Sequence, residues 1–206
     1  MNMRIITISR EFGSGGRELG KRLADELGFA YIDREIVTEI AKRASLDENY
    51  VDSVLESGAV NISLSYSSTI SHVNSINHCA TRIIREQQKI ITELAEKGDC
   101  VIVGRNADII LEKENPLRIF VHASIDSKVK RCQARATDGE ALTERQMKSK
   151  IKKIDKGRYK RHSLLSDIPW GDKRGYNLCV NTTDIEIKSL VPAVAEFARA
   201  WFEDNK

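Results

Sequence analysis

The chain has no apolar run long enough to span a membrane, although 41% of its 206 residues are apolar. A membrane-spanning helix needs about 20 consecutive apolar residues. The first residues lead directly into a strand pattern and lack the basic region, apolar stretch and cleavage site of a secretory leader. We therefore expect a cytoplasmic protein without a membrane partner, and the length suits one compact domain.

Cysteine is also scarce, since only four are present and none belongs to a C-x-x-C pair. Zinc sites and disulfide frameworks need cysteines at short, repeated spacings. The four are widely separated, and three of them fall in apolar-periodic segments. They are Cys79, Cys100, Cys132 and Cys179. This distribution favours buried free thiols over zinc ligands or disulfides.

Net charge is small as well, and a value of +3 does not by itself indicate a nucleic-acid-binding protein. The positive charge is nevertheless concentrated, because residues 145–162 hold nine Lys and Arg against the single acid Asp155. No aromatic platform or RNA motif accompanies this segment, so we expect no nucleic-acid partner. Two interpretations stay open, namely a solvated basic helix face and a set of cations that gathers around an anionic ligand.

Short apolar runs alternate with helical patterns along most of the chain. Residues 5–8 form a β-branched run, and Leu19, Leu23 and Leu27 then recur at helical spacing before the stop signal Gly28. Further strands are expected at 29–33, 100–103, 117–121 and 176–181, and further helices at 34–43, 82–97, 125–136, 143–162 and from 187 onward. This alternation predicts an α/β fold with a parallel sheet.

Two helix starts carry capping signals. Ser124 precedes one helical pattern as an N-cap, and Thr183 with Glu186 forms a capping-box pattern before the last helix. The face of that helix that should pack on the sheet consists of Ile187, Leu190, Val191, Val194, Ala198, Trp201 and Phe202.

Residues 45–78 carry the weakest pattern. Leu46, Val51, Val54 and Leu55 indicate a helix, but residues 57–75 are rich in Ser and Asn and show no sustained period. We interpret this stretch as a mobile segment over the ligand site, and a plain surface loop is the alternative.

The segment Gly13-Ser14-Gly15-Gly16 lies between the first strand and the first helix. Glycines let main-chain N–H groups converge on an anion, and the N-terminus of the next helix adds its positive dipole end. The pattern therefore predicts a phosphate site, with an ordinary glycine-rich turn as the alternative.

This segment departs from the Walker pattern G-x-x-x-x-G-K-[ST]. If Gly15 takes the last glycine position, Arg10 stands at the first glycine, Gly16 at the lysine and Arg17 at the hydroxyl residue. Arg17 could replace the charge of the lysine from its neighbouring position. The missing hydroxyl leaves Ser14 or water to help hold Mg²⁺.

Charged residues follow two other strand patterns. Asp33 and Arg34 come after the second strand, and Gly104 permits a sharp exit that leaves Arg105 and Asp108 one helical turn apart. Open α/β sheets bind ligands at this carboxyl edge. The alternatives are that Asp33 only caps a helix and that Arg105 and Asp108 only form a local ion pair.

Three separated stretches together resemble the cytidylate kinase-like family of P-loop nucleoside monophosphate kinases. They are ITISREFGSGGREL at 6–19, VIVGRNAD at 101–108, and DKGR at 155–158 with WGD at 170–172 and YNLCVN at 176–181. The resemblance implies a three-layer α/β P-loop kinase fold with a five-stranded parallel sheet flanked by helices. It also implies a single kinase domain over 1–206, with an acceptor-side segment near 45–78 and a lid near 143–175.

The resemblance also implies roles for individual residues. The ATP phosphates would be bound by Gly13, Ser14, Gly15, Gly16, Arg17 and Glu18. The acceptor would be bound by Arg105 and Asp108, and the place of Asp33 and Arg34 at the carboxyl edge of the sheet makes these two residues further acceptor-binding candidates. The catalytic cations would be Arg17, Lys156, Arg158 and Arg161.

The implied activity is Mg²⁺-dependent transfer of the γ-phosphoryl group of ATP to a nucleoside monophosphate, with CMP and dCMP as the favoured acceptors. ATP and the monophosphate would be the partners, and Mg²⁺ would enter with ATP. Two other functions stay open, because fold does not fix substrate. One is a kinase for a different small molecule, such as a sugar, a shikimate-like acid or a coenzyme precursor. The other is a nucleotide-binding regulatory module without catalysis, which the missing Walker lysine and hydroxyl favour.

Overall fold

The computed structural model describes residues 3–57, 70–135 and 142–205, with the backbone alone at 56–57 and 70–80. The strands are β1 (Ile5–Arg10), β2 (Ala30–Ile32), β3 (Cys100–Val103), β4 (Leu117–His122) and β5 (Leu178–Asn181). The α-helices are α1 (Gly16–Leu27), α2 (Glu35–Ala44), α3 (Glu48–Ser57), α4 (Ile70–Ala95), α5 (Ala107–Ile110), α6 (Ile125–Gln133), α7 (Glu144–His162) and α8 (Ile187–Asp204). Two 3₁₀ turns, η1 (Glu112–Glu114) and η2 (Lys173–Gly175), lie between them.

The sheet has five parallel strands in the order β2-β3-β1-β4-β5, which confirms the predicted α/β class. Strand β1 is central, and its Ile8 lies opposite Val103 of β3 and Ile119 of β4. The carboxyl ends of β1 and β3 therefore meet at one edge of the sheet. The glycine-rich loop and the turn at Gly104 start from this edge.

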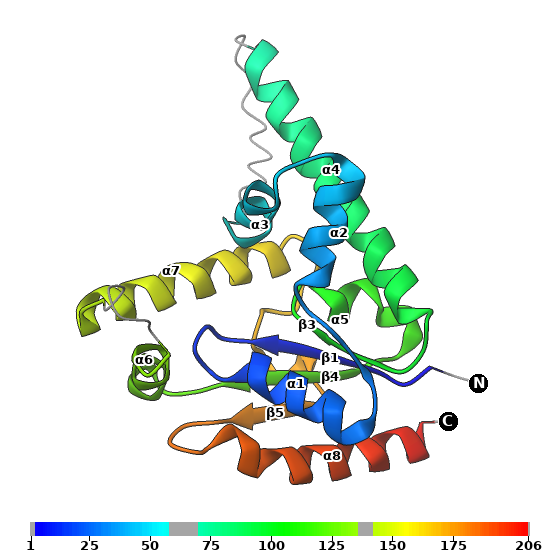
Figure 1. The fold of residues 1–206 in the computed structure, drawn as a ribbon, viewed down its shortest axis with the longest axis vertical. Coiled ribbons are helices and arrows are strands. Elements are labelled where there is room, and N and C mark those ends of the chain that lie inside the picture. The colour runs from blue at the N-terminus through cyan, green and yellow to red at the C-terminus, as the bar shows by residue number, and fades with distance from the viewer. Residues whose placement is uncertain (1–2, 58–69, 136–141, 206) are drawn as a thin grey trace.

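Helices cover both faces of the sheet and make three layers (Figure 1). Because strand side chains alternate between faces, Ile6 and Ile8 pack against α1 and α8 in one core, while Ile5 packs in the other core with α2, α3, α4 and α5. The predicted sheet-facing side of the last helix is confirmed, since Val191, Val194 and Ala198 are buried in the first core.

Helix α4 is longer than the sequence pattern predicted. It begins at Ile70 rather than near 82, and in Figure 1 its first turns project far from the sheet. Residues 70–75, for which the sequence showed no sustained period, are therefore helical, while residues 58–69 lie outside the described residues. That the segment is mobile stays a prediction. In the sequence Ile70, Val73 and Ile76 keep a spacing of three, but the intervening Ser and Asn residues have weak helix propensity and obscured it.

The predicted capping box before α8 is also wrong. Helix α8 begins with Glu186 as an N-cap that makes no side-chain cap bond. The Thr183 hydroxyl instead donates to Asn181 Oδ1 and accepts from the Ser124 N–H. These two bonds engage the hydroxyl in the turn after β5, so it does not cap α8. Ser124 caps α6 as predicted, by accepting from the Ser127 N–H.

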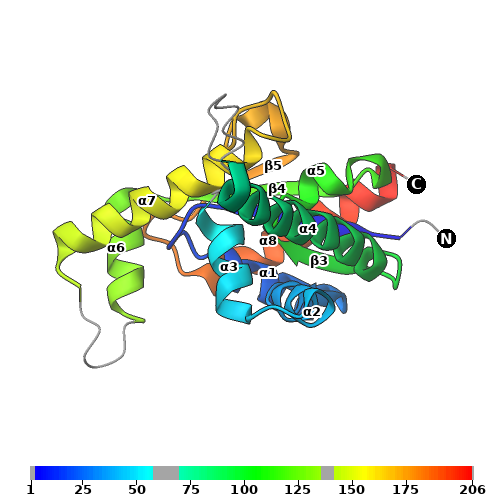
Figure 2. The same cartoon turned by 90° about the horizontal axis from the view of Figure 1, so that it is seen from above.

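Helix α7 coincides with the basic segment. It opens with a complete capping box between Thr143 and Gln146. Its buried Met147 and Ile151 form a small core with Val129 of α6, and Phe12 of the glycine-rich loop packs against this core. Helix α3 lies between α2 and α7, as Figures 1 and 2 both show. The basic helix thus packs against α6, the glycine-rich loop and α3.

Two findings in the described part of the chain concern the expectations about membrane spans and cysteines. No described helix is both long enough and apolar enough to cross a membrane. Cys100, Cys132 and Cys179 are free thiols, but Cys100 alone among them is buried. Cys79 lies where the side chains are not described.

Candidate active site

The glycine-rich loop joins β1 to the N-terminus of α1. Gly15 is the N-cap of α1 and has a left-handed φ of 85°. A Cβ atom at Gly15 would lie 2.3 Å from Ile187 Cδ1, so this turn requires glycine. The loop thereby presents the start of a helix, where N–H groups lack intrahelical partners, to the carboxyl edge of the sheet.

Side chains outside the loop hold its carbonyl groups. The Arg131 guanidinium donates to the Gly13 and Thr182 carbonyl oxygens, both at 2.9 Å. The Thr182 hydroxyl in turn donates to the Ser14 carbonyl at 2.6 Å. Since these bonds satisfy the loop carbonyls, the loop is fixed in shape before any ligand binds.

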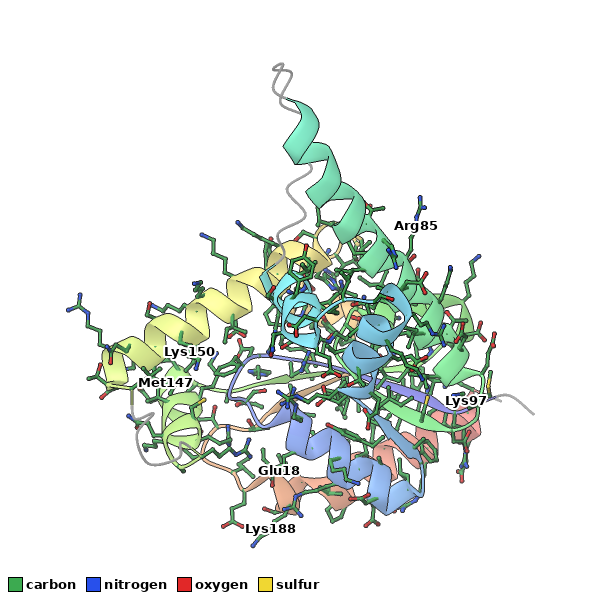
Figure 3. The ribbon with its side chains drawn as sticks, turned by 45° about the horizontal axis from the view of Figure 1, so that its top comes forward. Glu18, Arg85, Lys97, Met147, Lys150 and Lys188 are labelled. Carbon is green, nitrogen blue, oxygen red and sulfur yellow. The ribbon has the colours of Figure 1, made fainter. Side chains whose placement is uncertain are left out.

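A cavity of about 560 Å³ opens over this loop, and we call it the loop cavity. It is lined by loop residues and by side chains of α6 and α7, among them Met147 and Lys150, which are labelled in Figure 3. Its cations are Arg10, Arg17, Arg135, Lys150 and Arg158. Main-chain amides and five cations suit a polyanion such as a triphosphate.

A second cavity of about 220 Å³ lies beyond the ends of β1 and β3, and we call it the arginine cavity. Among the described residues that line it, four are arginines and none is acidic. They are Arg10, Arg105, Arg158 and Arg161. An apolar wall comes from α3, α4 and the segment after α7, through Val54, Leu55, Ile84, Leu164, Leu165 and Trp170. The arrangement suits a small molecule with an anionic group and an apolar or aromatic part.

The two cavities meet at Arg10 and Arg158, since both residues line both cavities. The Arg158 guanidinium donates to the Arg10 carbonyl at 2.9 Å and lies 5.9 Å from the centre of the Phe12 ring. Arg158 is the predicted lid arginine, and α7 places it at the junction of the two cavities. Arg161, one turn further along α7, lines the arginine cavity alone.

The turn after β3 holds three successive residues in left-handed conformation. Gly104, Arg105 and Asn106 have φ values of 73°, 59° and 53°. Such backbone costs about 1–3 kcal/mol at a non-glycine residue. The turn directs Arg105 into the arginine cavity, where its guanidinium donates to Asp52 of α3 at 2.8 Å. The buried Gln87 amide supports the turn by donating to the Arg105 carbonyl at 3.0 Å.

Asp108 lies beneath the site and lines neither cavity. Only 5% of the residue is exposed, and its carboxylate accepts from the Ser9 hydroxyl at 3.4 Å. Burial raises the pKa of this carboxyl group, and the nearby His162 opposes that shift. The alternative of a local ion pair with Arg105 is wrong, because Arg105 is paired with Asp52.

Asp33 and Arg34 follow β2 and lie near Arg17 at the start of α1. The buried Asp33 carboxylate forms an ion pair with Arg17, with 2.6 Å between Oδ2 and Nε. Both residues line a separate open hollow rather than the arginine cavity. Arg34, not Asp33, is the N-cap of α2, so the capping alternative for Asp33 is wrong. Their predicted acceptor contact stays a prediction that this geometry does not favour.

Three other predicted residues line neither the loop cavity nor the arginine cavity. The Ser14 hydroxyl is buried and donates to the Glu11 carbonyl at 2.9 Å. The Glu18 carboxylate accepts from Arg22 at 3.0 Å and also pairs with Arg135. Lys156 is exposed and lines neither cavity. Gly13, Gly15, Gly16 and Arg17 do line the loop cavity.

A buried ion network under the loop was not predicted. The Lys128 ammonium lies 3.0 Å from Glu11 Oε2 and 3.3 Å from Asp155 Oδ2. The other oxygen of Asp155 accepts from the Phe12 N–H at 2.7 Å. Burial raises the pKa of the Asp155 carboxyl group, which Lys128 and Arg158 oppose. Arg10 was noticed in the sequence only as a departure from the Walker pattern, and Lys128 gave no signal within its helical pattern.

The carboxylates near the loop do not form a metal cage. Glu11 and Asp155 are bound to Lys128, and Asp33 is bound to Arg17. Across the described ranges no group of three or more His, Cys, Asp or Glu residues could hold a metal ion. Any Mg²⁺ at this site would therefore be held mainly by ligand phosphates and water.

Comparisons with known proteins show the family and the fold of this chain. Residues 5–184 match the family model of the cytidylate kinase-like family. The fold is similar to that of an uncharacterized protein from Eubacterium ventriosum ATCC 27560, at 26% identity and a TM-score of 0.69 over 95% of this chain and 98% of that one.

Two shikimate kinases share the fold at lower identity. That of Bacteroides thetaiotaomicron has 14% identity and a TM-score of 0.56 over 96% of this chain and 99% of its own. That of Acinetobacter baumannii, in complex with shikimate, has 11% identity and a TM-score of 0.54 over 96% and 94%. No curated protein matched this chain.

Proposed function

Since the chain belongs to the cytidylate kinase-like family, we propose that it transfers the γ-phosphoryl group of ATP to a nucleoside monophosphate, with CMP and dCMP as the favoured acceptors. Family and fold support nucleotide-dependent phosphoryl transfer. The identity of the acceptor goes beyond what the family and the fold support.

One observation carries the proposal, namely that the loop cavity and the arginine cavity meet at Arg10 and Arg158. A phosphoryl transfer needs donor and acceptor oxygens roughly in line on the transferred phosphorus. Two anion-binding cavities with a shared cationic junction provide this arrangement if ATP occupies the first and the monophosphate the second.

The chemistry then needs little from the protein beyond alignment and charge. An oxygen of the acceptor monophosphate attacks the γ-phosphorus, a new P–O bond forms, and the bond to the β–γ bridging oxygen breaks so that ADP leaves with the electron pair. The attacking oxygen is already anionic, so no strong general base is required. Arg10 and Arg158 at the junction would neutralise charge on the transferred group, and α7 would exclude water.

Magnesium would enter as the Mg²⁺ complex of ATP. The carboxylates around the loop are engaged by Lys128 and Arg17, and the Ser14 hydroxyl is engaged by the Glu11 carbonyl. We therefore assign no protein ligand to the metal.

The arginine cavity also fits a second candidate function. Arginines recognise any phosphate or carboxylate, and the apolar wall would accept rings other than a nucleobase. A kinase acting on another small anionic molecule is thus the main alternative. A nucleotide-binding module without catalysis is the other, favoured by Gly16 and Arg17 at the Walker lysine and hydroxyl positions.

An acceptor screen tests the proposal. ADP release from ATP and Mg²⁺ would be followed with CMP, dCMP, UMP, AMP, GMP or shikimate, each against a reaction without acceptor. Turnover restricted to CMP and dCMP is the expected result. Turnover with shikimate alone would support the second candidate, and ATP binding without turnover would support the non-catalytic module.

A further inference from the structure

Two departures from the Walker pattern are neighbours in space. Gly16 stands where that pattern has its lysine, and Arg10 stands where it has its first glycine. A Cβ atom at Gly16 would lie 2.5 Å from Arg10 Cβ and 3.0 Å from Arg10 Cγ. A lysine at position 16 and an arginine at position 10 therefore exclude each other in this backbone.

Arg10 can reach the carboxyl edge of the sheet because residue 104 is a glycine and has no side chain. A Cβ atom at Gly104 would lie 1.8 Å from Arg10 Nη1 and 2.6 Å from Cζ. The side chain of Arg10 thus crosses Gly16 in the loop and ends against Gly104 after β3. This path explains why Arg10 lines both the loop cavity and the arginine cavity.

Arg17 is less well placed to supply the missing charge. Its Nε lies 2.6 Å from Asp33 Oδ2, and 56% of its side chain is exposed. It lines the loop cavity and the open hollow beside Asp33, but it does not line the arginine cavity. A phosphoryl group in transit between the two cavities would meet Arg10 before Arg17.

We propose that Arg10 is a catalytic residue that replaces the Walker lysine, with its guanidinium binding the γ-phosphoryl group as this group passes from ATP to the acceptor. This inference rests on the proposed function. The charge has moved from the first turn of α1 to the last residue of β1, and Gly16 and Gly104 leave the room it needs. A planar guanidinium donates to two phosphate oxygens at once. It would therefore hold the transferred group more rigidly than an ammonium does.

Kinetics of paired variants test the replacement. We expect Arg10→Met to lower kcat for ATP and CMP by about 10²–10³-fold, as loss of one charge-stabilising donor does in other enzymes. Gly16→Lys alone should be similarly impaired, because the new side chain collides with Arg10. The kcat of the double variant Arg10→Gly/Gly16→Lys should be at least tenfold higher than that of Arg10→Gly alone, because the double variant restores the Walker arrangement. Arg199→Met, which removes a distant exposed charge on α8, is the matched control.

Nucleotide binding supplies a second readout that does not depend on the acceptor. If Arg10 contacts the γ-phosphoryl group, Arg10→Met should weaken binding of Mg·ATP about tenfold or more and leave binding of Mg·ADP within threefold of the unchanged protein. The ratio of the two dissociation constants is internal to each variant, so a modest loss of stability does not alter it. Arg10→Lys should retain part of the preference for ATP.

The inference is overturned if Arg10→Met keeps both kcat and the ATP-to-ADP affinity ratio of the unchanged protein, or if the double variant is no faster than Arg10→Gly. These results differ from failure of the proposed function. If the proposed function fails, the unchanged protein will transfer no phosphoryl group to any monophosphate. The ratio of the ATP and ADP dissociation constants would still show whether Arg10 contacts the γ-phosphoryl group of ATP.

Discussion

The Asp155 carboxylate of α7 accepts a hydrogen bond from the Phe12 N–H of the glycine-rich loop at 2.7 Å. One turn later Arg158 donates to the Arg10 carbonyl at 2.9 Å. Helix α7 thus binds the backbone at two groups near the start of the glycine-rich loop, the N–H of Phe12 and the carbonyl of Arg10. The buried Lys128 ammonium neutralises Asp155 and Glu11 beneath this contact, so the position of α7 depends on a cation from α6.

Substitution of Lys128 by Met should destabilise the protein strongly. The side chain of Lys128 is 8% exposed, and its loss leaves Glu11 and Asp155 as neighbouring, partly buried carboxylates without their cation. Removing one partner of a buried ion pair costs about 3–5 kcal/mol. Urea unfolding at pH 7 measures the change. Lys148→Met, on α7, breaks only pairs with the exposed Asp126 and Glu144 and should leave the free energy of unfolding nearly unchanged. Equal losses for the two variants would contradict a stabilising role of the network.

Substitution of Arg105 by Ala should act on the acceptor. We expect the acceptor KM to rise about tenfold or more, because hydrogen bonds to charged groups contribute about 1.5–3 kcal/mol. The KM for ATP should stay nearly constant, since Arg105 lines only the arginine cavity. Steady-state kinetics with each substrate varied in turn makes the measurement. Arg85→Ala, an exposed arginine on α4 that is labelled in Figure 3, is the control. An unaltered acceptor KM would remove Arg105 from the binding site.

Substitution of Arg158 by Ala should act on turnover rather than on ATP affinity. Because Arg158 lies where the cavities meet, its charge is needed most when the phosphoryl group is between donor and acceptor. A fall in kcat of about 10²–10³-fold is expected, with the dissociation constant of Mg·ATP changed less than threefold. Lys160→Ala, an exposed cation on the same helix, should leave both values unchanged. A normal kcat for the Arg158 variant would exclude its role in transfer.

Substitution of Asp108 by Asn should change how stability depends on pH. Burial raises the pKa of Asp108 above its value in the unfolded chain. The folded protein therefore holds this proton more tightly, and the free energy of unfolding falls as pH rises from the unfolded pKa through the folded pKa. One such group contributes a slope of at most about 1.4 kcal/mol per pH unit.

Urea unfolding between pH 4 and pH 8 measures that slope. The part due to Asp108 should disappear in Asp108→Asn, while Asp25→Asn on the exposed face of α1 should keep it. The groups that face Asp108 are Ser9, His162 and Tyr176, and His162 acts in the opposite direction. An Asp108→Asn variant with an unchanged slope would mean that the carboxyl group titrates alike in the folded and unfolded states.

The sequence predicted those parts of the fold that depend on local pattern. The β-branched run of β1, the leucine spacing of α1 and the stop at Gly28 are each readable within a few residues, and the structure confirms all three. The helix predicted at 82–97 was shorter than α4, because weak helix formers near the start of α4 hid its apolar spacing. The capping box before α8 was a chance match, since Thr183 is bound to Asn181 instead.

The candidate site depended more on tertiary contacts, which a sequence pattern does not contain. The glycines of the glycine-rich loop and Arg105 were predicted at ligand sites, and they line the two cavities, whereas Ser14 lines neither. Their roles stay predictions. Asp108 looked accessible one turn from Arg105, yet the left-handed turn at Arg105 and Asn106 places it under the sheet edge. The path of Arg10 across Gly16 and Gly104 became visible only once three segments distant in sequence were side by side.

The most direct test of phosphoryl transfer between the two cavities is ³¹P nuclear magnetic resonance of ATP, Mg²⁺ and CMP mixed with the protein. We expect resonances of ADP and of the diphosphate of cytidine to appear together in equal amounts as ATP is consumed. ATP that is unchanged, or that yields ADP and inorganic phosphate while CMP persists, would contradict this expectation.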